Sequence, residues 1–357
     1  MSESKTVLVS GGAGYIGSAL VSRLLSDTDL NVKVFDNLMY GGDSLFHFFN
    51  FKKFSFIKGD LRTFDLPKIL NGVDFVVNLA ALVGEPICKK YPKEAQEINF
   101  EANINLAKTC EKQGIDRYVM MSTCSNYGLR QNQEMLIESD ELQPISLYSE
   151  TKVNSEKILL NELPELSTVV LRASTAYGMA SRIRFDLLLH QFIYEAWEKK
   201  RISLYGANSW RPMVHVDDIA MAIVLVLTQH DKMKKKDVFN VGFRNQNFKK
   251  MLELFNMGGP LFMSLISIAH ISLFVAIVLH IQGRNVLNLI KEAGLLALAL
   301  GVLGQLIGLF EAFKAIEQMG GVSAAMLAGG LKVSSITTIY GLMGYILSKV
   351  YLLIRGN

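Results

Sequence analysis

Short apolar runs rich in β-branched residues alternate along the first 250 residues with segments of helical periodicity. Six of these runs have the length and composition of strands: Thr6–Ser10, Val32–Asp36, Phe54–Lys58, Phe75–Asn78, Tyr118–Ser122 and Thr168–Arg172. Apolar strands separated by helices are typical of a parallel sheet that is buried on both faces. We therefore expect an α/β, Rossmann-type doubly wound parallel sheet over residues 1–250.

The last 107 residues have a different pattern, because charged residues almost disappear from them. No Asp, Glu, Lys or Arg occurs between Leu254 and Gly283, and Lys349 is the only one in the final long apolar stretch. About 20 apolar residues suffice to cross a hydrocarbon core ~30 Å thick. We expect an all-α module over residues 251–357 with three membrane spans, Leu261–Ile281, Ala293–Phe310 and Val333–Ile354. A buried helical hairpin in a soluble core is the alternative, and the charge-free length disfavours it.

Charge and cysteine usage restrict the classes of partner. The chain has 357 residues with a formal net charge of +4, and neither part shows the dense basic face that nucleic acids require. We expect no nucleic-acid partner. Cys88, Cys110 and Cys124 have no metal-ligand or disulfide spacing, so we expect no metal and a reducing cytosol. We also expect no secretory signal, since the first predicted strand follows Met1–Lys5 directly.

A glycine-rich loop follows the first predicted strand. In Gly11-Gly12-Ala13-Gly14-Tyr15-Ile16-Gly17, Gly11 permits a tight turn, Gly14 lets a pyrophosphate approach the backbone, and Gly17 lets the next helix pack on the strand. Asp36 ends the second strand 19 residues after Gly17, where a carboxylate accepts hydrogen bonds from the ribose of NAD and repels a 2′-phosphate. An ordinary turn explains the loop alone. Strand, loop, helix and acid together predict NAD binding.

Tyr148 and Lys152 lie four residues apart and therefore on one helical face. A tyrosine normally ionises near pH ~10, but an adjacent ammonium and the positive ring of the cofactor favour the phenolate. Tyr148 is thus a candidate base that takes a hydroxyl proton while hydride leaves the same carbon. The spacing is frequent by chance on solvated helices, but its position after the fifth strand favours the catalytic interpretation.

Several motifs occur in the order found in one enzyme family: Asp36-Asn37-Leu38, Gly59-Asp60-Leu61-Arg62, Asn78-Leu79-Ala80-Ala81, Tyr148 to Lys152, and Arg211 to Asp218. With these motifs, residues 5 to 250 resemble the NAD-dependent sugar-nucleotide epimerase/dehydratase group of the extended short-chain dehydrogenase/reductases. The resemblance implies that Thr123 hydrogen-bonds the reacting oxygen. It also implies further cofactor contacts at Tyr15, Ile16, Asn37, Asp60, Leu61, Leu79, Ala80, Ala81 and Asn99, with Tyr148 and Lys152 beside the nicotinamide.

One departure from the family pattern narrows the reaction. Dehydratases of the family follow the threonine with an Asp-Glu pair, whereas Cys124 and Ser125 stand here. Elimination of water is therefore disfavoured, and epimerisation through a 4-keto sugar is favoured.

Candidate substrate ligands are basic. Arg182, Arg184 and Arg211 are candidates to bind the diphosphate of a nucleotide sugar, since guanidinium binds phosphate oxygens with two parallel hydrogen bonds. Arg182 and Arg184 as solvated surface charges remain the alternative. His190, the fourth candidate substrate-binding residue, stands where relatives often carry Asn, so the resemblance does not identify the sugar nucleotide.

The membrane part resembles the MotA/TolQ/ExbB proton-channel family over about residues 251 to 354. The similarity lies in Gly301 to Phe313, Leu327 to Gly330 and Ile336 to Leu342. Family members carry a pore-facing Thr in each of the last two spans; Thr338 matches the second, and Gln305 replaces the first. These two residues either line a polar path or bond neighbouring helices.

The glycines of the spans imply close helix packing or a homo-oligomer in membrane lipid. The resemblance further implies a single-span partner that bears the protonated Asp.

The two similarities meet without a linker, because Phe248-Lys249-Lys250 is followed directly by Met251-Leu252-Glu253-Leu254. The substrate lobe is therefore expected to be truncated, and a natural fusion, joined reading frames and an engineered chimera all fit the junction. Two functions follow. One is a membrane-tethered epimerase with a cytoplasmic N-terminal domain. The other is a subunit of a proton-driven channel or motor whose N-terminal domain only binds NAD.

Overall fold

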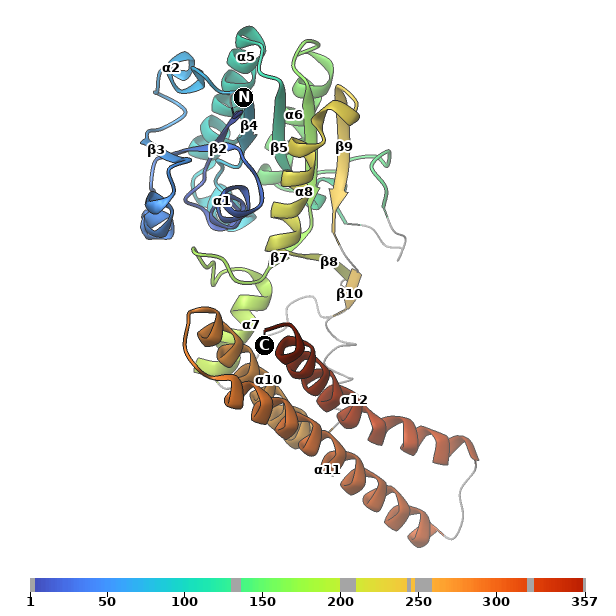
Figure 1. Cartoon of the computed structure of the whole chain (residues 1–357). Helices are drawn as coiled ribbons and strands as arrows, with labels where there is room; N and C mark the ends of the chain where they lie inside the picture. The colour runs from blue at the N-terminus through green and yellow to red at the C-terminus, as the bar shows by residue number, and fades with distance from the viewer. Residues whose placement is uncertain are drawn as a thin grey trace. The chain divides into compact units, whose positions relative to one another are not determined.

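The computed structural model describes residues 4–129, 136–199, 210–242, 245–247, 259–319 and 324–355. The described residues form an N-terminal and a C-terminal compact unit (Figure 1). The boundary expected at residue 250 lies outside the described residues.

The N-terminal unit is organised around a seven-stranded sheet with the order β3-β2-β1-β4-β5-β6-β9, in which every neighbouring pair is parallel. The strands are β1 (Thr6–Ser10), β2 (Asn31–Asp36), β3 (Phe54–Lys58), β4 (Phe75–Asn78), β5 (Arg117–Thr123), β6 (Thr168–Ala173) and β9 (Lys236–Val241). All six strands predicted from the apolar runs are present, so the predicted Rossmann-type sheet is confirmed. The strand order reverses between β1 and β4, and ligands of such sheets bind at that point.

Helices cover both faces of this sheet (Figure 1). α1 (Tyr15–Asp27) and α8 (Val216–Thr228) pack with Val7 and Val9 of β1 in one core. α2 (Leu66–Leu70), α5 (Asn103–Gln113) and α6 (Leu147–Asn161) pack with Leu8 in the other core. Successive side chains of a strand point to opposite faces, which is why the apolar run of β1 serves two cores.

Short elements complete the domain. They are η1 (Asp43–Asn50), α3 (Glu85–Lys90), α4 (Pro92–Gln96), η2 (Glu97–Ala102), η3 (Cys124–Tyr127), α7 (Leu188–Glu198) and η4 (His230–Lys232). A second sheet has the order β10-β8-β7, formed by β7 (Thr175–Tyr177), β8 (Trp210–His215) and β10 (Asn245–Asn247). β7 follows β6 directly, so this small sheet continues the carboxyl-terminal side of the main sheet, where the substrate lobe is expected.

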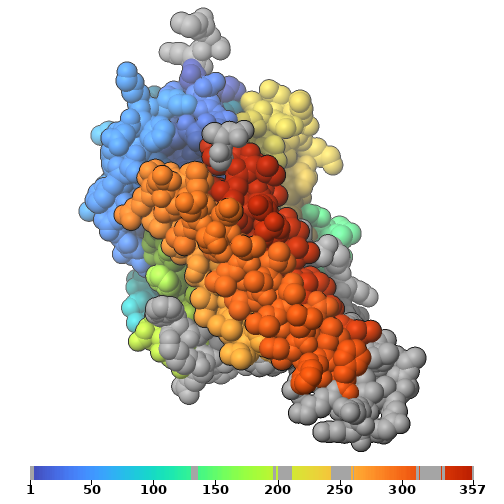
Figure 2. Space-filling view, turned by 60° about the horizontal axis from the view of Figure 1, so that its bottom comes forward, coloured from blue at the N-terminus to red at the C-terminus, as the bar shows by residue number. Residues whose placement is uncertain are grey.

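The C-terminal unit consists of α10 (Pro260–Ile281), α11 (Leu287–Met319) and α12 (Ala324–Arg355), which lie side by side in the space-filling view (orange to red in Figure 2). Leu261–Ile281, Leu287–Phe310 and Ser334–Arg355 are long and apolar enough to cross a membrane, which confirms the three expected spans. Glycines set the spacing between α11 and α12. A Cβ added at Gly341 would lie 2.3 Å from the carbonyl oxygen of Ala297, so only glycine permits this approach.

Candidate active site

The glycine-rich loop turns sharply between β1 and α1. Gly11 has a φ of 77°, which favours glycine, and a Cβ there would lie 2.8 Å from the amide nitrogen of Ala80. A Cβ at Gly17 would lie 2.3 Å from the carbonyl oxygen of Gly11, so α1 and the loop are in contact through backbone alone. At Gly14 the same test gives 3.1 Å, a tight but smaller conflict.

The N-terminus of α1 is suited to bind an anion. Gly14 is its N-cap residue and supplies no side-chain hydrogen bond to the first turn. The partial positive charge of the helix end and the first-turn N–H groups of Tyr15, Ile16 and Gly17 therefore face the position that the sequence assigns to a pyrophosphate. The Tyr15 side chain itself is buried.

Asp36 lies at the carboxyl end of β2 beside this loop. Its Oδ2 accepts a hydrogen bond from the N–H of Ala13 at 3.0 Å, and its Oδ1 accepts one from the N–H of Leu38 at 2.8 Å. These bonds hold the carboxylate at the rim of the glycine loop. Each oxygen keeps a lone pair for a ribose hydroxyl.

The segment after β4 forms the opposite wall. Leu79, Ala80 and Ala81 follow the strand and are half-buried, and the N–H of Leu79 donates to the Ser10 carbonyl at 2.9 Å. Asn99 is fully buried, and its side-chain amide accepts from the N–H of Leu82 at 2.7 Å and donates to the Leu82 carbonyl at 2.9 Å. Asn99 thus fixes the end of this wall, and both ends of its side-chain amide are bonded to the protein.

Asp60 and Leu61, two of the expected cofactor contacts, follow β3 and have different surroundings. Asp60 bonds Arg62, with Oδ2 and Nη2 2.8 Å apart, and the guanidinium lowers the pKa of that carboxyl. Asn37 is half-buried and also hydrogen-bonds Asp60. The Leu61 side chain, in contrast, is buried in the core with α2 and α5, so its backbone rather than its side chain borders the site.

The candidate catalytic pair, Tyr148 and Lys152, lies near the start of α6. Ser146 and Ser149 form a capping box there, each side chain accepting from the other residue's backbone N–H at 3.2 Å. This cap places Tyr148 in the first turn and Lys152 one turn later. The Lys152 Nζ lies 5.9 Å from the Tyr148 ring centroid and donates to the carbonyl of Met121 in β5 at 2.9 Å.

Burial shifts both groups toward their neutral forms. It lowers the pKa of Lys152 to about 8, against the effect of the nearby Glu156 carboxylate. It raises the pKa of Tyr148 to about 12, and the Arg184 guanidinium opposes this rise. The protein alone therefore keeps Tyr148 a phenol, and a further positive charge beside the ring is needed to make it a base.

Thr123 ends β5 with its hydroxyl oxygen accepting from the N–H of Ser125 at 3.1 Å, so its own hydrogen is available to a substrate oxygen. The adjacent Cys124 thiol donates to the Arg172 carbonyl at 3.2 Å and lies 3.5 Å from the Ser174 hydroxyl. Burial raises the pKa of Cys124. A protonated, engaged thiol is a poor nucleophile.

A loop from Gly178 to Arg184 is tied to the first turn of α1. The Tyr15 hydroxyl donates to the Gly178 carbonyl at 2.7 Å, and the backbone N–H of Arg182 donates to the Ser18 hydroxyl at 3.3 Å. The loop is thereby held at the helix end that would bind the cofactor phosphates.

The His190 ring is hydrogen-bonded to the backbone at both ends of this loop. Its Nε2 accepts from the N–H of Gly178 at 3.2 Å, and its Nδ1 lies 2.8 Å from the Arg184 carbonyl, which can only accept. The two partners assign the neutral Nδ1–H tautomer. Both ring nitrogens are therefore occupied by the backbone. His190 was expected to contact substrate, and the structure instead gives it a supporting role.

The three candidate arginines have different surroundings. Arg184 is mostly buried, pairs with Asp186, donates to the Val83 carbonyl at 3.4 Å and acts electrostatically on Tyr148. The Arg182 guanidinium carbon lies 4.3 Å from the Tyr40 ring centroid. Arg211 lies in β8 of the second sheet and is exposed. Of the three, Arg184 is the one whose charge opposes the rise in the pKa of Tyr148.

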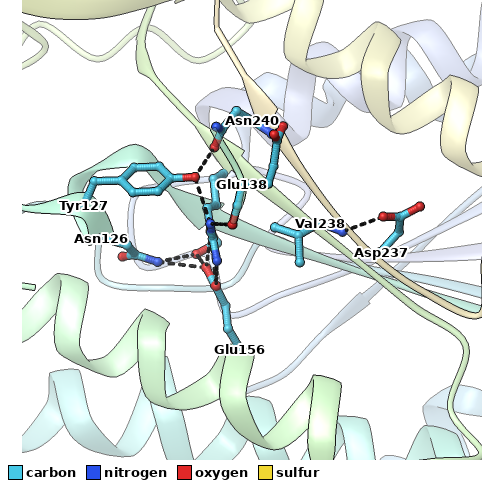
Figure 3. A network of polar contacts seen from close by, with 9 residues as sticks. Asn126, Tyr127, Glu138, Glu156, Asp237, Val238 and Asn240 are labelled. Atoms are coloured by element: carbon cyan, nitrogen blue, oxygen red, sulfur yellow. Dashed lines mark hydrogen bonds and ion pairs between the residues drawn. The ribbon is translucent and has the colours of Figure 1, made fainter. Parts of the chain in front are cut away.

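A buried polar network that includes Asn126, Tyr127 and Glu156 was not predicted (Figure 3). Glu156 accepts hydrogen bonds from Ser122 and, at 2.8 Å, from Asn126, and it pairs with Arg172 at 2.7 Å. Its sequence signal is the spacing: Glu156 is four residues after Lys152, on the same face of α6.

The network continues across the sheet. Arg172 donates to the Tyr127 hydroxyl at 2.8 Å, which donates to Asn240 Oδ1 at 2.7 Å, and the N–H of Asn240 donates to Glu138 (Figure 3). The ends of β5, β6 and β9 are therefore linked by one set of hydrogen bonds.

In the membrane unit, the Thr338 hydroxyl contacts both the carbonyl of Gly301, at 3.1 Å, and the side-chain oxygen of Gln305. The two candidate channel residues thus hydrogen-bond each other across α11 and α12. Among the residues that the structure describes, no cluster of His, Cys, Asp and Glu could hold a metal ion.

Two family models match the chain. The model of the NAD-dependent epimerase/dehydratase family matches residues 7–242, and that of the MotA/TolQ/ExbB proton channel family matches residues 279–350. The second match is shorter than the expected 251 to 354 and leaves most of α10 outside it.

Curated relatives match the N-terminal part. The uncharacterized UDP-glucose epimerase YtcB of Bacillus subtilis is 32% identical over 233 residues, which are 62% of this chain and 72% of that protein. The UDP-glucose 4-epimerase of Halalkalibacterium halodurans is 31% identical over 258 residues, covering 66% of this chain and 75% of the relative.

Solved structures agree. The UDP-N-acetylglucosamine 4-epimerase of Methanobrevibacter ruminantium M1, in complex with UDP-N-acetylmuramic acid, has a TM-score of 0.63 and 28% identity and covers 71% of this chain and 82% of that one. The UDP-glucuronic acid 4-epimerase of Bacillus cereus, in complex with UDP-glucuronic acid and NAD, has a TM-score of 0.63 and 26% identity, with coverage of 73% and 83%.

Proposed function

The chain belongs to the NAD-dependent epimerase/dehydratase family, joined to a MotA/TolQ/ExbB-type membrane module, and we propose that it inverts a hydroxyl-bearing carbon of a nucleotide sugar through Tyr148, Lys152 and Thr123. It is a membrane-tethered, NAD-dependent, epimerase-like enzyme. One observation supports this choice of residues: the Lys152 Nζ lies 5.9 Å from the Tyr148 ring centroid. The same Nζ donates a hydrogen bond to the carbonyl of Met121, which is in β5 two residues before Thr123.

The chain's residues fit NAD. The first turn of α1 has no side-chain cap, and Gly14 at its N-cap has no side chain in the way of a ligand, so this helix end suits a pyrophosphate. Asp36, held at the loop by two backbone N–H groups, suits the unsubstituted ribose of NAD. When bound, NAD supplies a reversible hydride acceptor.

The proton chemistry belongs to the protein. In the oxidation half, the Tyr148 phenolate accepts the proton of the sugar hydroxyl as the carbon loses hydride, leaving a ketone. The Thr123 hydroxyl donates a hydrogen bond to the same oxygen. The Lys152 ammonium stabilises the phenolate, and the positive nicotinamide ring of bound NAD would add the further charge needed to offset the burial that raises the pKa of Tyr148 to about 12. After the keto sugar rotates, the hydride would return to the opposite face of the carbonyl carbon while Tyr148 donates the proton to the oxygen, so the alcohol of opposite configuration forms.

Arg184 is the strongest of the candidate diphosphate ligands. Its guanidinium is positioned by Asp186 and by the Val83 carbonyl, and it acts on Tyr148 electrostatically. Arg182 and Arg211 are proposed as outer phosphate contacts, since guanidinium groups bind phosphate even at exposed sites. The substrate class is a uridine-diphosphate sugar, as in the names of the relatives.

The membrane module supports association with lipid, and the N-terminal domain is proposed to face the cytoplasm, where NAD is present. Oligomerisation through the glycine-lined helices and a single-span partner bearing an Asp are proposed from the MotA/TolQ/ExbB match.

The test is turnover of a panel of nucleotide sugars by the detergent-purified chain, with reduced nicotinamide followed by absorbance. We expect epimerised product, and Tyr148→Phe should lower the rate by about 10²- to 10⁴-fold without loss of NAD binding. Tyr91→Phe, at an exposed tyrosine outside the site, is the control. NAD binding with no turnover of any sugar would favour the alternative of a channel subunit. A product that has lost water would contradict the argument from Cys124 and Ser125.

A further inference from the structure

The segment after β2 is rich in phenylalanine, and none of these phenylalanines is among the candidate active-site residues. Phe46, Phe48, Phe49, Phe51, Phe54 and Phe56 fall within eleven residues, interrupted by two lysines. Three of the six side chains are exposed: Phe46 by 67%, Phe49 by 57% and Phe51 by 43%. Large aromatic side chains seldom remain in water in such numbers unless the surface contacts something.

The geometry of η1 explains this exposure. In a 3₁₀-helix, residues three apart lie on one face, so Leu45 and Phe48 share the buried face, and Phe46 and Phe49 share the exposed face. The Phe49 ring lies 5.2 Å from Phe54 and 6.4 Å from Phe56, between centroids. The exposed Phe49 ring therefore rests on two half-buried rings. Phe46, Phe49 and Phe51, the three exposed rings of this segment, are called the aromatic patch.

The charge around the aromatic patch is positive. Lys52 and Lys58 are exposed at its border, and Lys53 lies between them in sequence, whereas Asp43 at the start of η1 is the one acidic residue in 43–58. Aromatic rings next to lysines are the combination found where proteins lie on anionic membrane surfaces. The rings enter the interface, and the ammonium groups contact the headgroups.

A bilayer is always within reach of this domain. β10 ends at Asn247 and the first membrane helix begins at Pro260, so at ~3.5 Å per residue the domain cannot be more than about 45 Å from its membrane. Such a tether gives the lipid surface a high effective concentration near the domain, so a modest affinity of the domain for lipid is enough for binding.

We propose that the aromatic patch, Phe46, Phe49 and Phe51 with its flanking Lys52 and Lys58, is a docking surface for the anionic lipid surface of the bilayer in which the chain is anchored. The aromatic rings supply apolar contact and the lysines supply charge complementarity. Docking orients the enzyme domain over the membrane. The proposal does not rest on the domain's catalytic activity.

The test measures the depth of one side chain in the bilayer. Phe49→Cys, on a Cys124→Ser background because Cys88 and Cys110 are fully buried, is labelled with an environment-sensitive fluorophore in full-length chain reconstituted in phosphatidylcholine/phosphatidylglycerol nanodiscs. The matched control is Lys234→Cys, exposed just before β9, since β9 and β3 are opposite edges of the sheet.

We expect spin-labelled lipid to quench the probe at position 49 several-fold more than the probe at position 234, with a blue-shifted emission. Lys52→Glu with Lys58→Glu, or phosphatidylcholine alone, should reduce the quenching at 49. Equal quenching at the two positions would overturn the proposal. Emission typical of water from the probe at position 49 would also overturn it. So would a probe at 49 that spin-labelled lipid does not quench but that crosslinks two copies of the chain, because the patch would then be a self-association surface.

Discussion

The carboxylate of Glu156 and the guanidinium of Arg172 form an ion pair 2.7 Å long, with side chains that are 2% and 5% exposed. Glu156 lies one turn beyond Lys152 on α6 and also accepts a hydrogen bond from Ser122, the residue before Thr123. Glu156 therefore joins α6, which carries the candidate lysine Lys152, to β6 through Arg172 and to β5, which carries the candidate threonine Thr123, through Ser122.

Breaking this pair should destabilise the domain. Glu156→Ala leaves the Arg172 charge buried without its partner, so we expect the free energy of unfolding to fall by about 3–5 kcal/mol. Replacing both residues with Met removes both charges and should recover most of that loss. Denaturation of the full chain in detergent, followed by near-ultraviolet circular dichroism, measures both variants. Equal losses in the single and double variants would show that packing, and not charge pairing, matters here.

Lys152 should give stability a distinctive pH dependence. Burial lowers its pKa to about 8 in the folded chain, against 10.5 ordinarily. Between these values the unfolded chain binds more protons, so the stability of the wild type gains from this group as pH rises from about 8 to about 10.5. Relative to Lys152→Met, the gain should reach about 3 kcal/mol at most. The exposed Lys108→Met is the control, and a flat difference at Lys152 would contradict the shift.

Cofactor choice should depend on Asp36. We expect calorimetry to give at least about tenfold tighter binding of NAD than of NADP, since the carboxylate faces the 2′-position. Asp36→Asn removes the charge and keeps one oxygen, which can accept from the N–H of Ala13 or of Leu38 but not from both, so it should narrow the preference at some cost in the stability of the loop. Equal affinities of the wild type for both cofactors would refute the assignment.

Substitutions at two glycines of the loop should have different effects, one on folding and one on NAD binding. Gly17→Ala places a Cβ 2.3 Å from a backbone oxygen, and backbone cannot move aside, so we expect loss of folded stability. Gly14→Val meets its nearest atom at 3.1 Å and should fold, yet lose NAD because the side chain occupies the pyrophosphate position. Melting temperature and NAD titration separate the two. A Gly14→Val variant that binds NAD normally would place the phosphate elsewhere.

Sequence patterns predicted the sheet well because burial on both faces leaves its strands apolar throughout. β1, β3 and β4 have the predicted bounds, and the three membrane spans agree within a few residues at most ends. Glycine positions were predictable for a different reason: at a tight turn or a close approach of two backbones, few residues other than glycine fit.

Polar partners were harder to predict, because they join residues far apart in sequence. His190 and Arg184 were both expected to bind substrate, but only the folded loop shows that His190 gives its ring to backbone groups while Arg184 lies near Tyr148. The Glu156–Arg172 pair likewise depends on α6 and β6 packing together. A glutamate on a helix surface has the same local pattern.

Topology is the point on which the two parts of the chain make opposite demands. Arg284 and Lys291 between the first two spans, with Lys349 and Arg355 at the end, favour a cytoplasmic position for both segments by the positive-inside rule. A large NAD-dependent domain needs the cytoplasm on the N-terminal side, and three spans then put Arg355 outside. We expect the domain to determine the orientation, because a few loop charges do not cause a folded domain of this size to cross the membrane.

Gly356→Cys, on a Cys124→Ser background, should therefore react with a membrane-impermeant maleimide only from outside, whereas Lys234→Cys should react only from the cytoplasmic side. Labelling of Gly356→Cys from the cytoplasmic side would mean that the helices keep the opposite orientation or that one span does not cross, and the predicted topology would be wrong.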